Sequence, residues 1–473
     1  MLEPDTILLS SKPRRRMLLW AAVIGCPFVL VFAWLGYKWY LDREYSAAIE
    51  EADRLDPGWR LAELEAARAE VPDSENAALQ VLAAKKLLPT GWFPPPPGTI
   101  TTKLEDDLDH LPPTQRLDES QSKKLGAELG KAAAALSAAR RVAEIPRGRY
   151  VVLWTADAIG TLVPHVQEAR EIGRLLQLDA VLRGENGDID GALASCSAIL
   201  NTGRSFGDET AAITQLVRLS CQRLAIRSLE RALAQGTASD AALLEIQRLL
   251  EDESEQPLLL IATRAERAMI HQFLKFVENG GHYRASFGMR SRTGSNDIDE
   301  FQDRAKARGC HAAYLRYLNE CVEIAKLPPE QQVERLRHFD LRPPENVPQL
   351  LAALGGLNVD LKKLAENFHH RLAFVRCGVA AVAVERYRLA NGRWPERLDD
   401  LVPDYLSKIP IDPFDGQPLR FRWLKDSVII YTVGEDQQND GGQRVRIKAG
   451  APDADVGFQL WDAERRRQSA AKQ

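Results

Sequence analysis

The stretch "KIPIDPFDGQPLRFRW", residues 408–423, marks the point where helical patterns give way to extended ones. Two prolines flank a turn rich in Asp, and alternating apolar and polar residues follow. Before it, residues 358–390 repeat apolar side chains every three or four positions, and after it "SVIIYTV" and "ADVGFQLW" have the composition of strands. This order predicts a small α+β domain over residues 346–462, a long helix packed on a three-stranded antiparallel sheet.

Three blocks within this region, "YRLANGRWP", "LVPDYLSKIPIDPFDGQPLRF" and "YTVGEDQQNDGG", occur in a characteristic order. With this order, residues 370–462 resemble the C-terminal domain of the major pseudopilin of type II secretion systems. In that family a processing site and an apolar helix lead into the fibre core. Here no such processing motif is found, and the apolar segment lies over 300 residues upstream. The resemblance therefore implies the fold without the fibre-assembly mechanism.

The resemblance also implies a calcium site, because pseudopilins bind calcium in an acidic loop between their last strands. The corresponding stretch is "GEDQQNDGGQRVRIKAGAPDAD", and its candidate oxygen ligands are Asp436, Asn439, Asp440, Asp453 and Asp455. Gly441 and Gly442 would leave backbone carbonyls accessible to the ion. Arg444, Arg446 and Lys448 lie in the same loop and would oppose a cation, so an ordinary solvated acidic turn is the alternative.

The middle of the chain, residues 42–345, carries one amphipathic helical pattern after another, separated by short turns. Asp188 and Ser239 are predicted helix N-caps, and Gly236 a helix stop. Short turns predict a mainly α fold made of helical hairpins. The pattern is loosely similar to tetratricopeptide repeats but lacks their regular period. Such arrays usually bind protein partners.

Near the N-terminus, "MLLWAAVIGCPFVLVFAWLG", residues 17–36, is free of charge. About 20 helical residues match the bilayer core, and a basic segment precedes the run. The sequence therefore predicts a transmembrane helix over residues 17–40, with a basic tail over 1–16 in the cytoplasm. The rest of the chain would then lie outside the inner membrane of a bacterium. Acylation of Cys26 in a lipobox-like "VIGC", a cleaved signal peptide and a buried core helix are the alternatives.

Composition excludes some classes of function. The net charge is −4 and no broad basic field is present, so nucleic acid is excluded as a partner. The motifs of serine hydrolases, nucleotide-binding loops, zinc proteases and dinucleotide-binding enzymes are missing from the sequence. Glu366 and His370 share a helical face beside His369, but two ligands without a third are weak evidence for a metal, and surface positions are expected for them.

The six cysteines form no CxxC motif. Bridges between Cys196 and Cys221 and between Cys310 and Cys321 are conceivable, but buried free thiols are the favoured interpretation.

These features predict a non-enzymatic single-pass envelope protein. Its helical domain would act as a scaffold for protein partners, its C-terminal module would resemble a pseudopilin, and a charged tail would follow over residues 463–473. An accessory component of a type II secretion or pilus-like apparatus is one alternative. An enzyme whose site is assembled within the helical domain is another.

Overall fold

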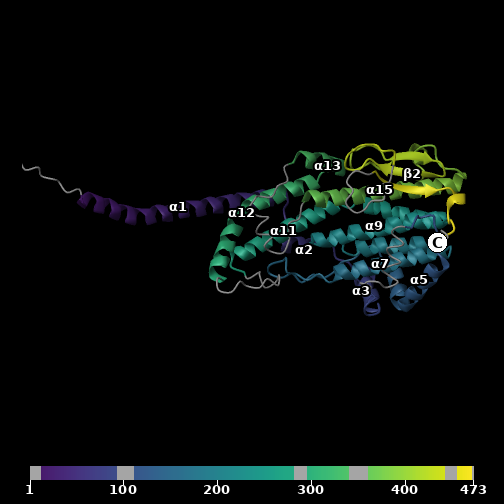
Figure 1. The fold of residues 1–473 in the computed structure, drawn as a ribbon, viewed down its shortest axis with the longest axis horizontal. Helices are drawn as coiled ribbons and strands as arrows, with labels where there is room; N and C mark the ends of the chain where they lie inside the picture. Colours follow the sequence, from purple (N-terminus) through teal and green to yellow (C-terminus); the bar gives the residue numbers. More distant parts are fainter. Residues whose placement is uncertain (1–11, 93–110, 282–295, 340–360, 443–454, 471–473) are drawn as a thin grey trace, which may run out of the picture.

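The computed structural model describes residues 12–92, 111–281, 296–339, 361–442 and 455–470, except for the side chains of residues 12–27, 296–303 and 361. Helices make up most of this part, and a small sheet lies along one side of them (Figure 1). A long N-terminal helix extends away from the body.

This first helix, α1 (Lys12–Leu55), packs its C-terminal part against α12 (Asn296–Ala325). Ala52 is fully buried in the contact. Arg316 of α12 donates a hydrogen bond to the carboxylate of Glu44 at 2.6 Å. Small apolar residues and ion pairs therefore fix the end of α1 to the body.

The predicted membrane anchor over residues 17–40 was wrong. Within the described ranges, no helix combines the length and apolar character that crossing a membrane requires. The predicted fold class is therefore corrected, because it included a transmembrane helix that the described helices do not provide. The membrane as a partner and the inner-membrane location with a cytoplasmic N-terminus are corrected too, because both depended on this segment. The side chain of Cys26 lies outside the described residues.

A helical array, α2–α12, forms the bulk of the body. Within it, α7, α8 and α9 all pack against one another. Besides α12, its helices are α2 (Leu61–Ala67), α3 (Ala77–Lys86), α5 (Glu119–Lys131), α6 (Ala133–Arg140), α7 (His165–Glu185), α8 (Ile189–Arg204), α9 (Ala212–Gln235), α10 (Asp240–Ser254) and α11 (Leu258–Glu278). A shorter helix, α13 (Pro329–His338), follows the array.

Helix ends in the array follow local sequence signals. The side chain of Asp188 accepts a hydrogen bond from the backbone of Gly191 at 2.9 Å, and Ser239 accepts one from Ala242 at 3.2 Å. Both predicted N-caps are thus confirmed, and α9 ends immediately before Gly236, as predicted. The five cysteines whose side chains are described are buried free thiols.

The C-terminal module begins with the long helix α15 (Leu361–Asn391). The strands β1 (Arg420–Leu424), β2 (Ser427–Thr432) and β3 (Val456–Trp461) form an antiparallel sheet in the order β1-β2-β3. Residue Ile430 pairs with Phe458, and both are buried against the helices.

The quoted turn before β1 is closed by a buried carboxylate. Asp412 accepts hydrogen bonds from the backbones of Phe414 and Val433, each at 2.9 Å, and also binds Arg420. Burial raises the pKa of Asp412 to about 6. This carboxylate therefore fixes the turn to the end of β2.

Helix α15 lies between the array and the sheet (Figure 1). Its residues Ala380 to Val384 are fully buried. Glu230 of α9 accepts a hydrogen bond from the backbone of Gln459 in β3 at 2.8 Å, and Arg466 after the sheet donates to Glu385 of α15. One hydrophobic core runs from the array into the module.

Candidate functional site

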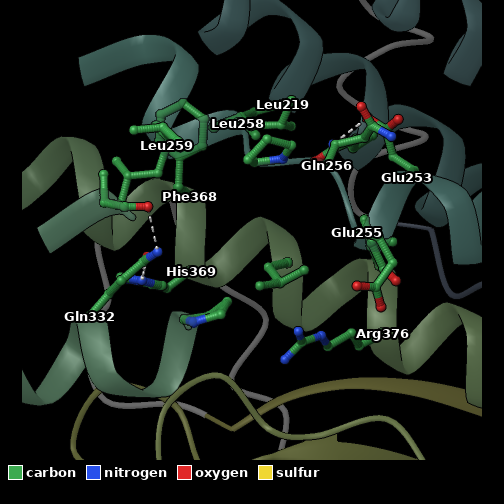
Figure 2. Close-up of a pocket in the computed structure, with 18 of the residues that line it drawn as sticks. Leu219, Glu253, Glu255, Gln256, Leu258, Leu259, Gln332, Phe368, His369 and Arg376 are labelled. Carbon is green, nitrogen blue, oxygen red and sulfur yellow. Dashed lines mark hydrogen bonds between the residues drawn. The ribbon is translucent and has the colours of Figure 1, made fainter. Parts of the chain in front are cut away.

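A cavity of about 210 Å³, called here the α15 pocket, opens where the array meets the C-terminal module. Its walls come from α9, the α10–α11 turn, the α12–α13 turn and the middle of α15 (Figure 2). The lining residues Leu219 and Arg376 lie more than 150 residues apart in sequence. Only the packing of α15 on the array brings them together.

One wall of the α15 pocket is apolar. Leu219 comes from α9, Leu258 and Leu259 begin α11, and Phe368 comes from α15 (Figure 2). Phe368 belongs to the apolar face that the sequence predicted for this helix, formed by Leu361, Leu364, Phe368, Leu372, Val375, Val379 and Val382. Apart from residue 361, whose side chain is not described, these positions are buried or half-buried. The wall suits an apolar group of a ligand or partner.

The side chains of Gln332 and His369 form a rigid polar link at one end of the pocket (Figure 2). The amide nitrogen of Gln332 donates to the carbonyls of Ala325 and Leu327, at 3.1 and 2.6 Å, which satisfies acceptors at the end of α12. Its amide oxygen therefore faces His369, and Nε2 of that histidine is the donor, at 2.9 Å.

His369 is buried, with 4% of its surface exposed. Burial lowers the pKa of His369 to about 3, and the charges of His370 and Arg376 act in the same direction. The imidazole is therefore neutral near pH 7. It fixes α13 to α15, and a general acid or base with such a pKa would be poorly matched to neutral pH.

The other end of the pocket carries opposite charges. Arg376 lies there beside the exposed Glu255 (Figure 2). The guanidinium of Arg376 donates to the backbone carbonyl of Ile411 at 2.7 Å, which links α15 to the turn before β1. Burial lowers the pKa of Arg376, whereas the negative charges of Glu255, Glu330 and Asp412 favour the charged form.

A third acid, Glu253, lines the pocket but is already paired. It accepts from the guanidinium of Arg218 at 2.8 and 2.6 Å and from Gln222 at 2.7 Å. The nearby hydroxyl of Ser254 donates to the carbonyl of Glu251 at 2.8 Å. The carboxylate of Glu253 is therefore occupied by Arg218 and Gln222, and the hydroxyl of Ser254 by the backbone of its own helix.

A second cavity of about 150 Å³ lies on the other side of His369, between α13, the start of α15 and the loop after β2. Glu366 lines it, and His370 is paired with Glu435 at 2.6 Å. Glu435, the partner of His370, lines this cavity together with Glu366. Glu366 and His370, considered as a metal pair in the sequence, are both half-buried, and His369 beside them is buried.

The predicted calcium ligands lie in the loop between β2 and β3. Asp455 is 3% exposed, and its Oδ2 accepts from the backbone of Gly442 at 2.7 Å. Its Oδ1 is buried and has no hydrogen-bond partner among the residues that the structure describes. Burial raises the pKa of Asp455, and the negative charges of Asp440 and Asp436 act in the same direction, whereas hydrogen bonding to the backbones of Gly442 and Asp440 opposes the rise. An unpartnered buried carboxylate oxygen among other acids fits a cation.

Other candidate calcium ligands either bind other groups of the protein or lie outside the residues that the structure describes. Asn439 accepts through its side-chain oxygen from Tyr431 at 3.0 Å and from the backbone of Gly441. The carbonyl of Gly441, expected to be accessible, accepts from Arg422 at 2.8 Å. Asp453 lies outside the described residues, as do Arg444, Arg446 and Lys448. Within the described ranges, no group of three or more His, Cys, Asp or Glu side chains is placed to hold a metal.

Sequence reasoning missed the polar members of the α15 pocket, Gln332 and Arg376. Neither belongs to a motif, and each gains its role from a partner in another element. The only local signal was the proline pair at residues 328–329, which starts α13 and so places Gln332.

Comparisons with known proteins add no family assignment, because no family model, curated protein or solved structure matches this chain.

Proposed function

We propose that this protein is a non-enzymatic interaction protein whose α15 pocket binds an apolar segment of a protein partner. The observation that carries this proposal is the composition of the pocket. Its apolar wall of Leu219, Leu259 and Phe368 faces an end that carries Glu255 and Arg376. An apolar anchor with polar groups at the margin is the usual composition of a hot spot in a protein interface.

The alternative role in a secretion or pilus-like fibre receives less support. Pseudopilin-type assembly would need the long helix to be available for packing in a fibre. Here α15 is covered by α9 and α10 on one side and by the sheet on the other. Its segment from Ala380 to Val384 has no exposed surface. This arrangement favours a module that completes a binding pocket within its own chain.

The pocket is tested by crosslinking from its margin. We expect benzoylphenylalanine in place of the exposed Glu255 to form a discrete adduct with a partner protein in cells of the source organism. The same residue in place of Arg393, which is exposed on the surface after α15, is the positional control. Leu372→Trp would fill the pocket, because Leu372 lines it, and should abolish the adduct.

An adduct that persists in the Leu372→Trp variant, or that forms equally from position 393, would show that the pocket is not the contact. The melting temperature of each variant, measured in parallel, separates loss of binding from loss of folding.

We further propose that calcium binds the β2–β3 loop through Asp455. The support is the buried Oδ1 of this residue, which has no hydrogen-bond partner within the described part of the loop, with Asp436 and Asp440 close enough to affect its ionisation. Calcium at a hundred times its dissociation constant would stabilise the fold by about 2.7 kcal/mol.

We therefore expect millimolar calcium to raise the melting temperature of the full chain by several degrees, with magnesium less effective. Asp455→Asn should remove the shift, whereas Asp404→Asn, at an exposed position outside the loop, should retain it. The same calcium shift in both variants, or none in the parent protein, would count against this site.

A further inference from the structure

The connection that precedes α7, residues 145–164, carries the three most exposed large apolar side chains in the described part of the chain. Val151 is 84% exposed, Leu153 85% and Leu162 89%, whereas every other large apolar side chain described, those of α1 included, is at most 70% exposed. Single exposed apolar residues are ordinary, but three in one short connection indicate a surface that another molecule covers.

The segment that carries Val151 and Leu153 is fixed at both ends. Tyr150 is buried, its ring stacks on His165 with 4.3 Å between the ring centres, and its hydroxyl lies 3.1 Å from that of Ser205. Trp154 packs against an apolar cluster between α2 and α11. The exposed side chains between these anchors are therefore held outward by the fold and are ready to bind without further ordering.

The backbone between the two anchors is unpaired. Within the described ranges, no N–H or C=O group of residues 151–154 forms a hydrogen bond. Exposure alternates along the segment, since Val151 and Leu153 are exposed whereas Val152 and Trp154 are half-buried. A period of two is that of an extended strand. The segment therefore has the features of an edge strand whose donors and acceptors are available for pairing.

The connection turns back on itself after this segment. The backbone N–H of Thr155 donates to the hydroxyl of Thr161 at 2.9 Å, which brings the part that carries Leu162 back toward Leu153. The three exposed side chains thus belong to one compact connection.

No charge protects this edge. Asp157 is the only charged residue among residues 151–163; it is 4% exposed, and its carboxylate accepts from the backbone of Gly160 at 3.2 Å. Exposed edge strands usually carry a lysine or a proline that prevents pairing with another chain. Neither residue type occurs between Pro146 and Pro164. In charge, the edge complements an uncharged strand.

We propose that residues 150–155 form a docking strand for an extended, uncharged segment of a partner protein. The segment adds as a β-strand through backbone hydrogen bonds and places alternate apolar side chains against Val151, Leu153 and Leu162. None of these residues lines the α15 pocket or belongs to the calcium loop, so the test of the docking strand does not depend on either.

The test is pulsed hydrogen–deuterium exchange of the full chain in the presence of a short capped peptide of alternating valine and threonine. Amides without a hydrogen-bond partner exchange fast, and pairing with a strand protects them. We expect millimolar peptide to slow exchange within residues 151–154 by at least about threefold. Leu153→Lys, which adds a charge to the edge, should remove this protection.

Leu87→Lys is the matched control, because Leu87 is another exposed leucine, following α3, and this variant should keep the protection. Both variants should melt within about 2 °C of the parent, since each replaced side chain is exposed. A peptide methylated at its backbone nitrogens lacks the donors for strand pairing and should give no protection.

Equal protection by the methylated and unmethylated peptides, the same response in the two lysine variants, or no protection of the parent protein would overturn the docking strand. Protection that rises with protein concentration in the absence of peptide would identify a second copy of this chain as the occupant and would overturn the proposed partner.

Discussion

Glu266→Gln is expected to stabilise this protein at pH 8 by roughly 3 kcal/mol, with a gain below about 1 kcal/mol at pH 5. Glu266 lies on α11 with 5% of its surface exposed, and its Oε1 has no hydrogen-bond partner among the described residues. Burial raises the pKa of Glu266 from 4.5 to about 7. The folded state therefore binds its proton more tightly than the unfolded state does.

The sign of the effect follows from this raised pKa. The contribution of Glu266 is most favourable below its unfolded pKa of 4.5 and is lost as pH rises through about 7. Glutamine carries no charge at either pH and avoids the loss. Any cost of burying its amide is the same at both pH values, so the difference between them isolates ionisation.

Urea unfolding of the two proteins at pH 5 and pH 8 measures this difference. Glu245→Gln, at an exposed position on α10, should change stability little at either pH. If Glu266→Gln had the same effect at both pH values, Glu266 would not ionise differently in the folded and unfolded states, and its proposed environment would be wrong.

Arg466→Met is expected to destabilise the protein by about 3–5 kcal/mol, because it breaks a buried ion pair. Glu385 is fully buried and accepts from Arg466 at 2.8 and 2.9 Å and from Arg388 at 2.9 and 2.7 Å. Arg466 also donates to the carbonyls of Trp461 and Gly236, at 2.9 and 2.8 Å. One side chain therefore joins α15, the end of β3 and the end of α9.

The neighbouring residue supplies a matched control. Arg465 pairs with Asp426 on the surface at 3.2 Å, so Arg465→Met should cost less than about 1 kcal/mol. The double variant Glu385→Gln with Arg466→Met should regain part of the loss, since no buried carboxylate is left without its partner. Equal losses in the two single arginine variants would contradict a structural role for the buried pair.

Acid should diminish the effect of Arg466→Met. Burial opposes ionisation of Glu385, but hydrogen bonds from Arg388 and Arg466 outweigh it and lower the pKa of Glu385 below its usual 4.5. The stabilisation is present above pH 4.5 and is lost as pH falls through the lowered pKa. Stability measured down the acid range should therefore converge for the parent and the variant.

Much of the secondary structure could be predicted because its signals act over a few residues. Asp188 and Ser239 cap their helices through the next turn of backbone. The first strand falls on the alternating residues at the end of the stretch 408–423, and the other two fall on "SVIIYTV" and "ADVGFQLW", whose composition predicted strands. The apolar segment near the N-terminus shows the limit of such patterns. Its composition resembled a membrane span, but the described helix contains no stretch that meets the length and apolarity required.

The sequence by itself determined where helices and strands begin and end, because caps, turns and apolar periodicity depend on neighbouring residues. Only the tertiary structure decided which of them meet. Leu219 and Arg376 share a pocket although they lie more than 150 residues apart in the sequence. Such contacts depend on how α15 packs between the array and the sheet, a long-range choice that no local pattern specifies.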